Sequence, residues 1–189
     1  MTHPANYDHI LARDIERVLL SSEHIARRVK ELGASVSADY RNRDLVLVNI
    51  LKGGIVFLAD LSRAITIPHS FDLIGASSYR GAMRSSGKII ITKDLDLDLR
   101  GKDVLLVEDI LDTGRTLNLV LELIRLHEPA SLEICCLLDK QRPRDLKIPI
   151  KYTGFHLPDE FVVGYGLDYQ ERYRNLPFIG VLKPEVIHG

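Results

Sequence analysis

The chain has 189 residues, of which 46% are hydrophobic and 27% are charged. This composition is that of a globular protein, and the length suits one domain, so a disordered or fibrous chain is excluded. The net charge of −1 offers no bulk attraction to nucleic acid or anionic lipid. Any phosphate must therefore be held by local geometry.

The chain shows neither a membrane span nor a secretory signal. Its longest uninterrupted run of aliphatic or Cys residues, 134–138, is far too short to cross a bilayer, and charged residues interrupt the apolar N-terminal stretch. Cys135 and Cys136 lie side by side in that run, where we expect them to pack as reduced, small hydrophobic side chains. We therefore expect a cytoplasmic protein.

The predicted elements alternate between helices and strands along the chain. Helical spacing of apolar residues predicts helices at 22–40, 55–65 and 117–124. Apolar runs predict strands at 45–51, 71–79, 88–92, 104–107, 132–138 and 161–163. Because several strands read as nearly unbroken aliphatic runs, we expect an α/β fold with a mainly parallel sheet covered on both faces. Ligands of such sheets bind beyond the carboxyl ends of the strands, here residues 52–54, 108–116 and 139–144.

The most informative segment, 104–116, reads Val-Leu-Leu-Val-Glu-Asp-Ile-Leu-Asp-Thr-Gly-Arg-Thr. The strand ends in Glu108-Asp109, and the turn formed by 113–116 leads directly into a helix. Backbone N–H groups at a helix start form an anion site, which Gly114 would let close around a phosphate. The two acids would repel bare phosphate, so we expect them to face a ribose diol or Mg²⁺. The glycine patterns of Walker and dinucleotide-binding loops are absent.

Residues 107–116 resemble the signature of the type I phosphoribosyltransferases, which bind phosphoribosyl pyrophosphate with Mg²⁺. Further elements follow in the matching order from residue 22 to the C-terminus, and the chain is most similar to the hypoxanthine-guanine phosphoribosyltransferases of purine salvage. The resemblance implies one domain over 1–189, with a core at about 40–140 and a small hood built from the N-terminal segment and about 141–189.

The resemblance also implies roles at the pyrophosphate and ribose. Pyrophosphate would be held by Lys52, Gly53 and Arg174, with a cis peptide expected between Lys52 and Gly53. A flap carrying Ser78 and Tyr79 would close over the site. Glu108 and Asp109 would hold the ribose and, with Asp168, Mg²⁺. The 5′-phosphate would be bound by Asp112, Thr113, Gly114, Arg115 and Thr116.

At the purine, the resemblance implies that Lys140 donates to the O6 oxygen, Phe161 stacks on the ring, and Val162 and Asp168 contact the base. Asp112 would be the general base at N7. The implied reaction joins hypoxanthine or guanine to phosphoribosyl pyrophosphate, giving IMP or GMP and pyrophosphate. The family also implies a homodimer or homotetramer that binds neither nucleic acid nor membrane.

Three alternatives remain open on the residues alone. A xanthine-preferring enzyme would need a donor for the 2-oxo group near Asp168, which the sequence does not decide. An RNA-binding regulator with the same fold would need a basic face, which the net charge of −1 disfavours. A ribose-phosphate binding module without turnover would not need both Lys52 and Arg174.

Overall fold

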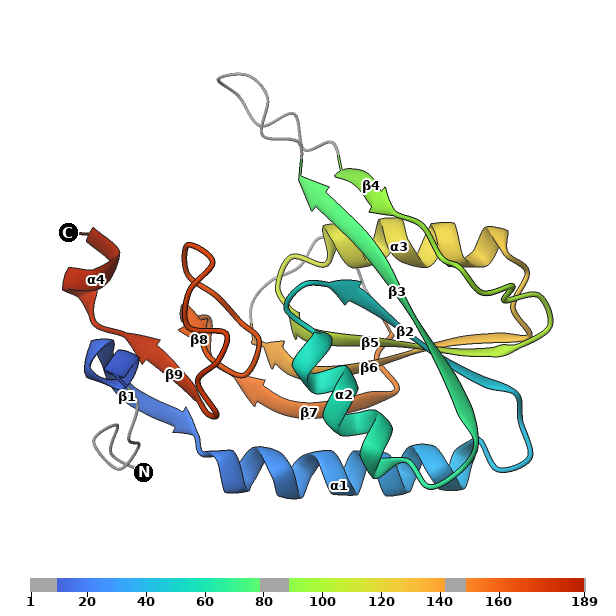
Figure 1. Cartoon of the computed structure of the whole chain (residues 1–189), viewed down its shortest axis with the longest axis horizontal. Coiled ribbons are helices and arrows are strands. Elements are labelled where there is room, and N and C mark those ends of the chain that lie inside the picture. The colour runs from blue at the N-terminus through green and yellow to red at the C-terminus, as the bar shows by residue number, and fades with distance from the viewer. Residues whose placement is uncertain (1–9, 79–88, 142–148, 189) are drawn as a thin grey trace.

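The computed structural model describes residues 10–78, 89–141 and 149–188 (Figure 1). Its centre is a six-stranded sheet in the order β4-β3-β2-β5-β6-β7. The strands are β2 (Leu45–Leu51), β3 (His69–Ser78), β4 (Ile89–Lys93), β5 (Asp103–Leu111), β6 (Ser131–Lys140) and β7 (Tyr152–Leu157). All neighbours pair in parallel except β3 and β4, which are antiparallel. The predicted α/β fold with a mainly parallel sheet is confirmed.

Helices cover both faces of this sheet (Figure 1). Helices α1 (Ser22–Asp39) and α2 (Ile55–Ala64) pack on one face, and α3 (Arg115–Leu126) packs on the other. Successive strand residues point to opposite faces, so Leu105 and Val107 pack with α1 and α2, whereas Val104 and Leu106 pack with α3. Two apolar faces explain why the central strands have unbroken aliphatic sequences.

A second, smaller sheet joins the two ends of the described chain. Strands β1 (Ile15–Leu20), β9 (Ile179–Leu182) and β8 (Val162–Val163) pair antiparallel in the order β1-β9-β8. A short 3₁₀ helix (Ile10–Asp14) precedes β1, and α4 (Pro184–His188) follows β9. The small sheet has its own core around Phe178 and lies beyond the carboxyl ends of β5, β6 and β7 (Figure 1). We propose that it forms the hood.

Several boundaries differ from the sequence prediction. Strand β5 continues past Asp109, because Ile110 and Leu111 still pair with β6. Lys140 is the last residue of β6, not part of the loop that follows it, and Phe161 precedes β8. Strands β1, β7 and β9 were not predicted: they are short or contain charged residues and glycine, and their partners are distant in sequence. None of the helices within the described ranges is long and apolar enough to span a membrane.

Candidate active site

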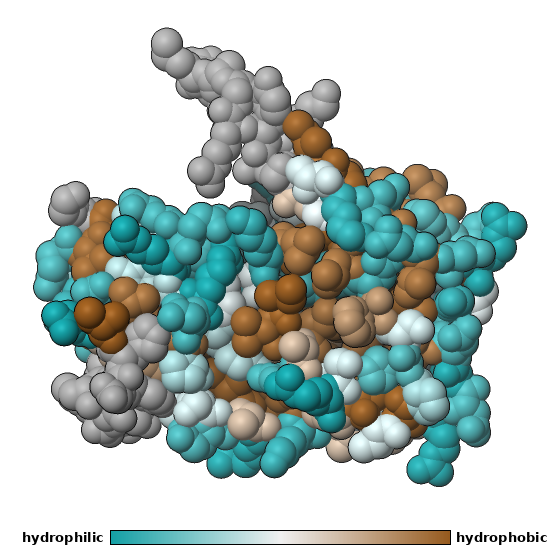
Figure 2. All heavy atoms as spheres, in the orientation of Figure 1, coloured by the Kyte–Doolittle hydropathy of each residue, from teal (hydrophilic) through white to brown (hydrophobic). Residues whose placement is uncertain are grey.

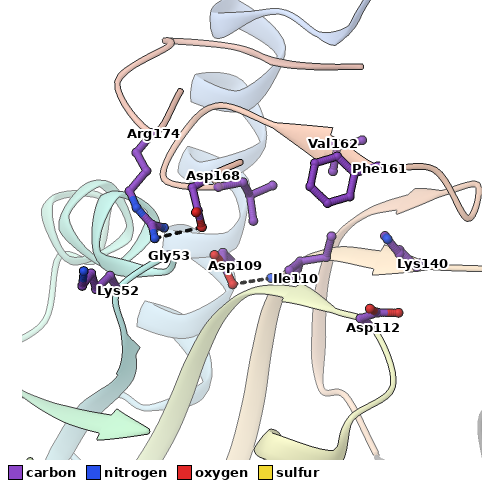
Figure 3. Close-up of a pocket in the computed structure, with 11 residues that line it drawn as sticks. Lys52, Gly53, Asp109, Ile110, Asp112, Lys140, Phe161, Val162, Asp168 and Arg174 are labelled. Atoms are coloured by element: carbon purple, nitrogen blue, oxygen red, sulfur yellow. Dashed lines mark hydrogen bonds and ion pairs between the residues drawn. The ribbon is translucent and has the colours of Figure 1, made fainter. Parts of the chain in front are cut away.

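A cavity of about 350 Å³ opens where the carboxyl ends of the main sheet meet the small sheet (Figure 3). Its volume suits a small-molecule ligand. Segments far apart in the sequence form its walls, namely the turn after β2, the end of β5, the end of β6 and the segment 161–174. The lining residues are Lys52, Gly53, Asp109, Ile110, Asp112, Lys140, Phe161, Val162, Leu167, Asp168 and Arg174. Most of the residues predicted for the site are therefore brought together.

The turn after β2 is packed closely against its neighbours at Gly53. A Cβ atom at Gly53 would lie 1.9 Å from Asp109 Oδ2, and one at Gly166 would lie 2.1 Å from the carbonyl oxygen of Gly53. The turn thus contacts both β5 and the 164–174 loop through its backbone. The peptide bond between Leu51 and Lys52 is cis, so the expected position between Lys52 and Gly53 is wrong by one bond. Neither bond involves proline, and side-chain identity therefore does not mark which one is cis.

Two of the cationic side chains that line the cavity, Lys52 and Arg174, are held by carboxylates of the 168–171 segment. Arg174 Nη2 lies 2.8 Å from Asp168 Oδ1 (Figure 3), and its Nη1 donates to the carbonyl oxygen of Gly166 at 2.8 Å. Lys52 Nζ lies 2.9 Å from Glu171 Oε2, and this hydrogen bond lowers the pKa of Glu171. Glu171 was not predicted from the sequence as a residue near the site. Its spacing of three residues from both Asp168 and Arg174 could have indicated that it lies close to them.

The two adjacent acids of β5, Glu108 and Asp109, are separated by the alternation of the strand. The carboxylate of Asp109 faces the cavity, where its Oδ1 accepts the Ile110 N–H at 2.7 Å (Figure 3). Glu108 does not line this cavity, and its Oε2 is buried without a hydrogen-bond partner. Burial raises the pKa of Asp109, and burial together with the charge of Asp109 raises the pKa of Glu108 further. An unpartnered buried carboxylate is costly, so it marks a position where a ligand would add a partner.

The phosphate loop continues from the cavity wall at Asp112. Gly114 is the N-cap of α3 with a left-handed φ of 77°, a conformation that favours glycine. Gly114 has no side chain with which to cap the helix, and the backbone N–H groups at the start of α3 are suited to an anion. Thr113, Arg115 and Thr116 are exposed beside it. Residues 113–116 do not line the cavity itself, so the anion site predicted there would adjoin it.

Three of the residues predicted to bind the purine, Lys140, Phe161 and Val162, lie together on one side of the cavity, whereas Asp168 lies beside Arg174 (Figure 3). Lys140 is buried with its Nζ 3.7 Å from Asp159 Oδ1. Phe161 is 47% exposed, and its ring meets that of Tyr169 edge to face at 5.7 Å. The partly exposed ring of Phe161 offers a planar base a stacking surface, and the buried ammonium of Lys140 offers it a hydrogen-bond donor group.

Part of the predicted flap lies outside the described residues. Ser78 is the last residue of β3, whereas Tyr79 and the polar stretch 80–87 fall in the undescribed range, as do Arg142 and Arg144 of the basic loop. The role of the flap therefore stays a prediction.

Comparisons with known proteins agree with this geometry. Residues 18–170 match the family model of the phosphoribosyl transferase domain. The chain is 51% identical to the hypoxanthine-guanine phosphoribosyltransferase of Staphylococcus epidermidis, covering 92% of this chain and 97% of the relative. It is 48% identical to the hypoxanthine phosphoribosyltransferase of Escherichia coli K12, covering 86% and 93%. The structure of a hypoxanthine phosphoribosyltransferase from Staphylococcus aureus superposes with a TM-score of 0.89 at 49% identity, covering 95% and 97%. The chain therefore belongs to the phosphoribosyltransferase family, among its hypoxanthine-guanine phosphoribosyltransferases.

Proposed function

We propose that this protein transfers the 5-phosphoribosyl group from phosphoribosyl pyrophosphate to N9 of hypoxanthine or guanine, releasing pyrophosphate. One observation carries the proposal: a single cavity joins a cationic wall, Lys52 and Arg174, to a base-binding wall, Lys140 and Phe161. The two substrates of such a transfer need these two kinds of surface. The 5′-phosphate would bind at the start of α3, outside the cavity proper.

Asp112 is suited to act as the general base, because it lines the cavity between the purine side and the phosphate loop. In the reaction, the bond from ribose C1 to the pyrophosphate oxygen breaks and the bond from C1 to N9 forms. The proton on N7 of the purine passes to the Asp112 carboxylate. A positioned base contributes ~10²–10⁴-fold in rate. Lys52 and Arg174 stabilise the negative charge that develops on departing pyrophosphate.

The acids of the cavity fit Mg²⁺ bound together with the substrate. Asp109 and Asp168 both face the cavity, and the charge of Asp168 contributes to the raised pKa of Asp109, so a cation there would relieve their repulsion. Within the described ranges no group of three or more His, Cys, Asp or Glu could hold a metal ion alone. A shell completed by pyrophosphate oxygens and water is typical of Mg²⁺. When bound, the ion would neutralise charge on the leaving group.

Glu108 is proposed as a ribose ligand, since its Oε2 is buried without a partner and a sugar hydroxyl could donate to it. Lys140 is proposed as the residue that selects 6-oxopurines. Its ammonium has only donors, so it can pair with O6 of hypoxanthine or guanine but not with the 6-amino group of adenine.

We also propose that the chain forms a homodimer or homotetramer in the cytoplasm. Figure 2 shows apolar side chains on the face that carries α2 and β3, where Phe71 is 56% and Ile55 is 44% exposed. An apolar patch on a surface supports contact with another protein chain. The free, buried Cys135 and Cys136 support a reducing compartment.

The test is pyrophosphate release in the presence of phosphoribosyl pyrophosphate, Mg²⁺ and one base at a time: hypoxanthine, guanine, xanthine, adenine or uracil. Turnover with the 6-oxopurines and none with adenine is expected. Comparable turnover with adenine would overturn the role of Lys140, and the rate with xanthine measures selection at the 2-position. No turnover with any base, from protein that still binds phosphoribosyl pyrophosphate, would overturn the proposed activity and favour a regulator of the same fold.

A further inference from the structure

The carboxylate of Glu171 lies against both cations of the pyrophosphate wall. Its Oε2 is 2.9 Å from Lys52 Nζ, and its Oε1 is 3.4 Å from Arg174 Nη2. One carboxylate therefore contacts two cationic side chains. Lys52 is 119 residues from Glu171 in the sequence, whereas Arg174 lies three residues after it. This arrangement of two oxygens between two cations is the one that a bound phosphate group would adopt.

The backbone holds Glu171 in this place. The Glu171 N–H donates to Asp168 Oδ2 at 2.9 Å, and Asp168 in turn pairs with Arg174. Gln170 and Glu171 both have left-handed backbone conformations, with φ of 53° and 62°. Such conformations are uncommon for residues other than glycine and persist where the surroundings impose them. The loop thus presents the Glu171 side chain to Lys52, although neither side chain is buried.

We infer that Glu171 is an internal counter-anion. Its carboxylate pairs with the pyrophosphate-binding cations Lys52 and Arg174 when no substrate is bound, and the pyrophosphate group of the substrate displaces it. This inference rests on the proposed function. It makes Glu171 a positioning residue that holds the two cations beside each other and that weakens binding of pyrophosphate. Its return to Lys52 would assist release of the pyrophosphate product.

The exposure of the pair makes this exchange possible. The side chains of Lys52 and Glu171 are 67% and 66% exposed, so solvent screens their attraction and the pair is weak. Pyrophosphate carries several charges and offers more oxygens to the same donors, so it binds them in place of one carboxylate. Loss of both contacts would tighten pyrophosphate binding about threefold to tenfold, which corresponds to ~0.7–1.4 kcal/mol of binding free energy.

The test compares pyrophosphate binding by the wild-type protein and Glu171→Gln, using inorganic pyrophosphate with Mg²⁺ in isothermal titration calorimetry. The amide keeps the size of the side chain and removes its charge. We expect Kd for pyrophosphate to fall about threefold to tenfold and product inhibition by pyrophosphate to strengthen by the same factor. The matched control is Glu31→Gln, which removes another exposed pair, to Arg28 at 2.7 Å, remote from the cavity. It should leave Kd unchanged.

A second pair of variants tests whether Glu171 acts through Lys52. In a Lys52→Met background, Glu171→Gln should tighten pyrophosphate binding less than it does in the wild-type background. An unchanged or weaker affinity of Glu171→Gln, in protein with the wild-type melting temperature, would overturn the inference alone. Failure of the wild-type protein to bind pyrophosphate at all would overturn both the inference and the proposed function.

Discussion

Gly164 occupies a position where a single methyl group should disturb both the fold and the site. It begins the loop that carries Asp168 and Arg174, and it has a φ of 99°. A Cβ atom here would lie 2.0 Å from the carbonyl oxygen of Phe178, a backbone atom that cannot rotate away. The left-handed conformation costs a residue with a Cβ atom ~1–2 kcal/mol, and overpacking costs ~1–3 kcal/mol. We expect Gly164→Ala to lower the free energy of unfolding by about 2–5 kcal/mol and to raise KM for phosphoribosyl pyrophosphate, because the loop must shift.

The measurement is urea unfolding followed by circular dichroism, together with steady-state kinetics. Gly101→Ala is the matched control, since Gly101 also has a positive φ of 71° but a Cβ there would meet nothing within 4 Å. This control isolates the conformational cost, ~1–2 kcal/mol, and should leave KM unchanged. If Gly164→Ala is no less stable than Gly101→Ala and keeps the wild-type KM, the close packing of this loop does not hold the site.

Three further changes test the site and the fold. Lys140→Met should lower kcat/KM for hypoxanthine about 10- to 100-fold without lowering any rate with adenine, and equal effects on both bases would contradict its role. Asp112→Asn should lower kcat ~10²–10⁴-fold in single-turnover assays, a larger factor than the one by which it weakens binding of phosphoribosyl pyrophosphate in calorimetry. Burial acts to raise the pKa of Asp72, but three backbone N–H groups outweigh it and lower the pKa. Its charge therefore stabilises the fold above pH ~4 and less as pH falls through the lowered pKa. Asp72→Asn should lower the free energy of unfolding by ~1–3 kcal/mol at pH 7, measured by urea unfolding. If the substitution lowers it by the same amount at pH 3, the charge of Asp72 is not what stabilises the fold.

The sequence alone determined five of the six strands of the central sheet and most of the residues of the cavity. Strands β2 and β5 bury both faces, so their aliphatic runs identify them without any knowledge of their partners. The 107–116 segment combines strand, acids and a helix start within one stretch, and it therefore marks an anion site locally. Gly114 was predictable for the same reason, because its left-handed conformation belongs to the turn itself.

Only the tertiary structure decided how the acids and cations are distributed. Alternation along β5 directs Asp109 into the cavity and away from Glu108, but which face meets the cavity depends on where Gly53 packs. The pairing of Glu171 with Lys52 joins loops from two sheets, and no local pattern encodes such a contact. The small sheet is likewise formed by chain ends that meet only after folding, since β1 and β9 satisfy their backbone hydrogen bonds through each other.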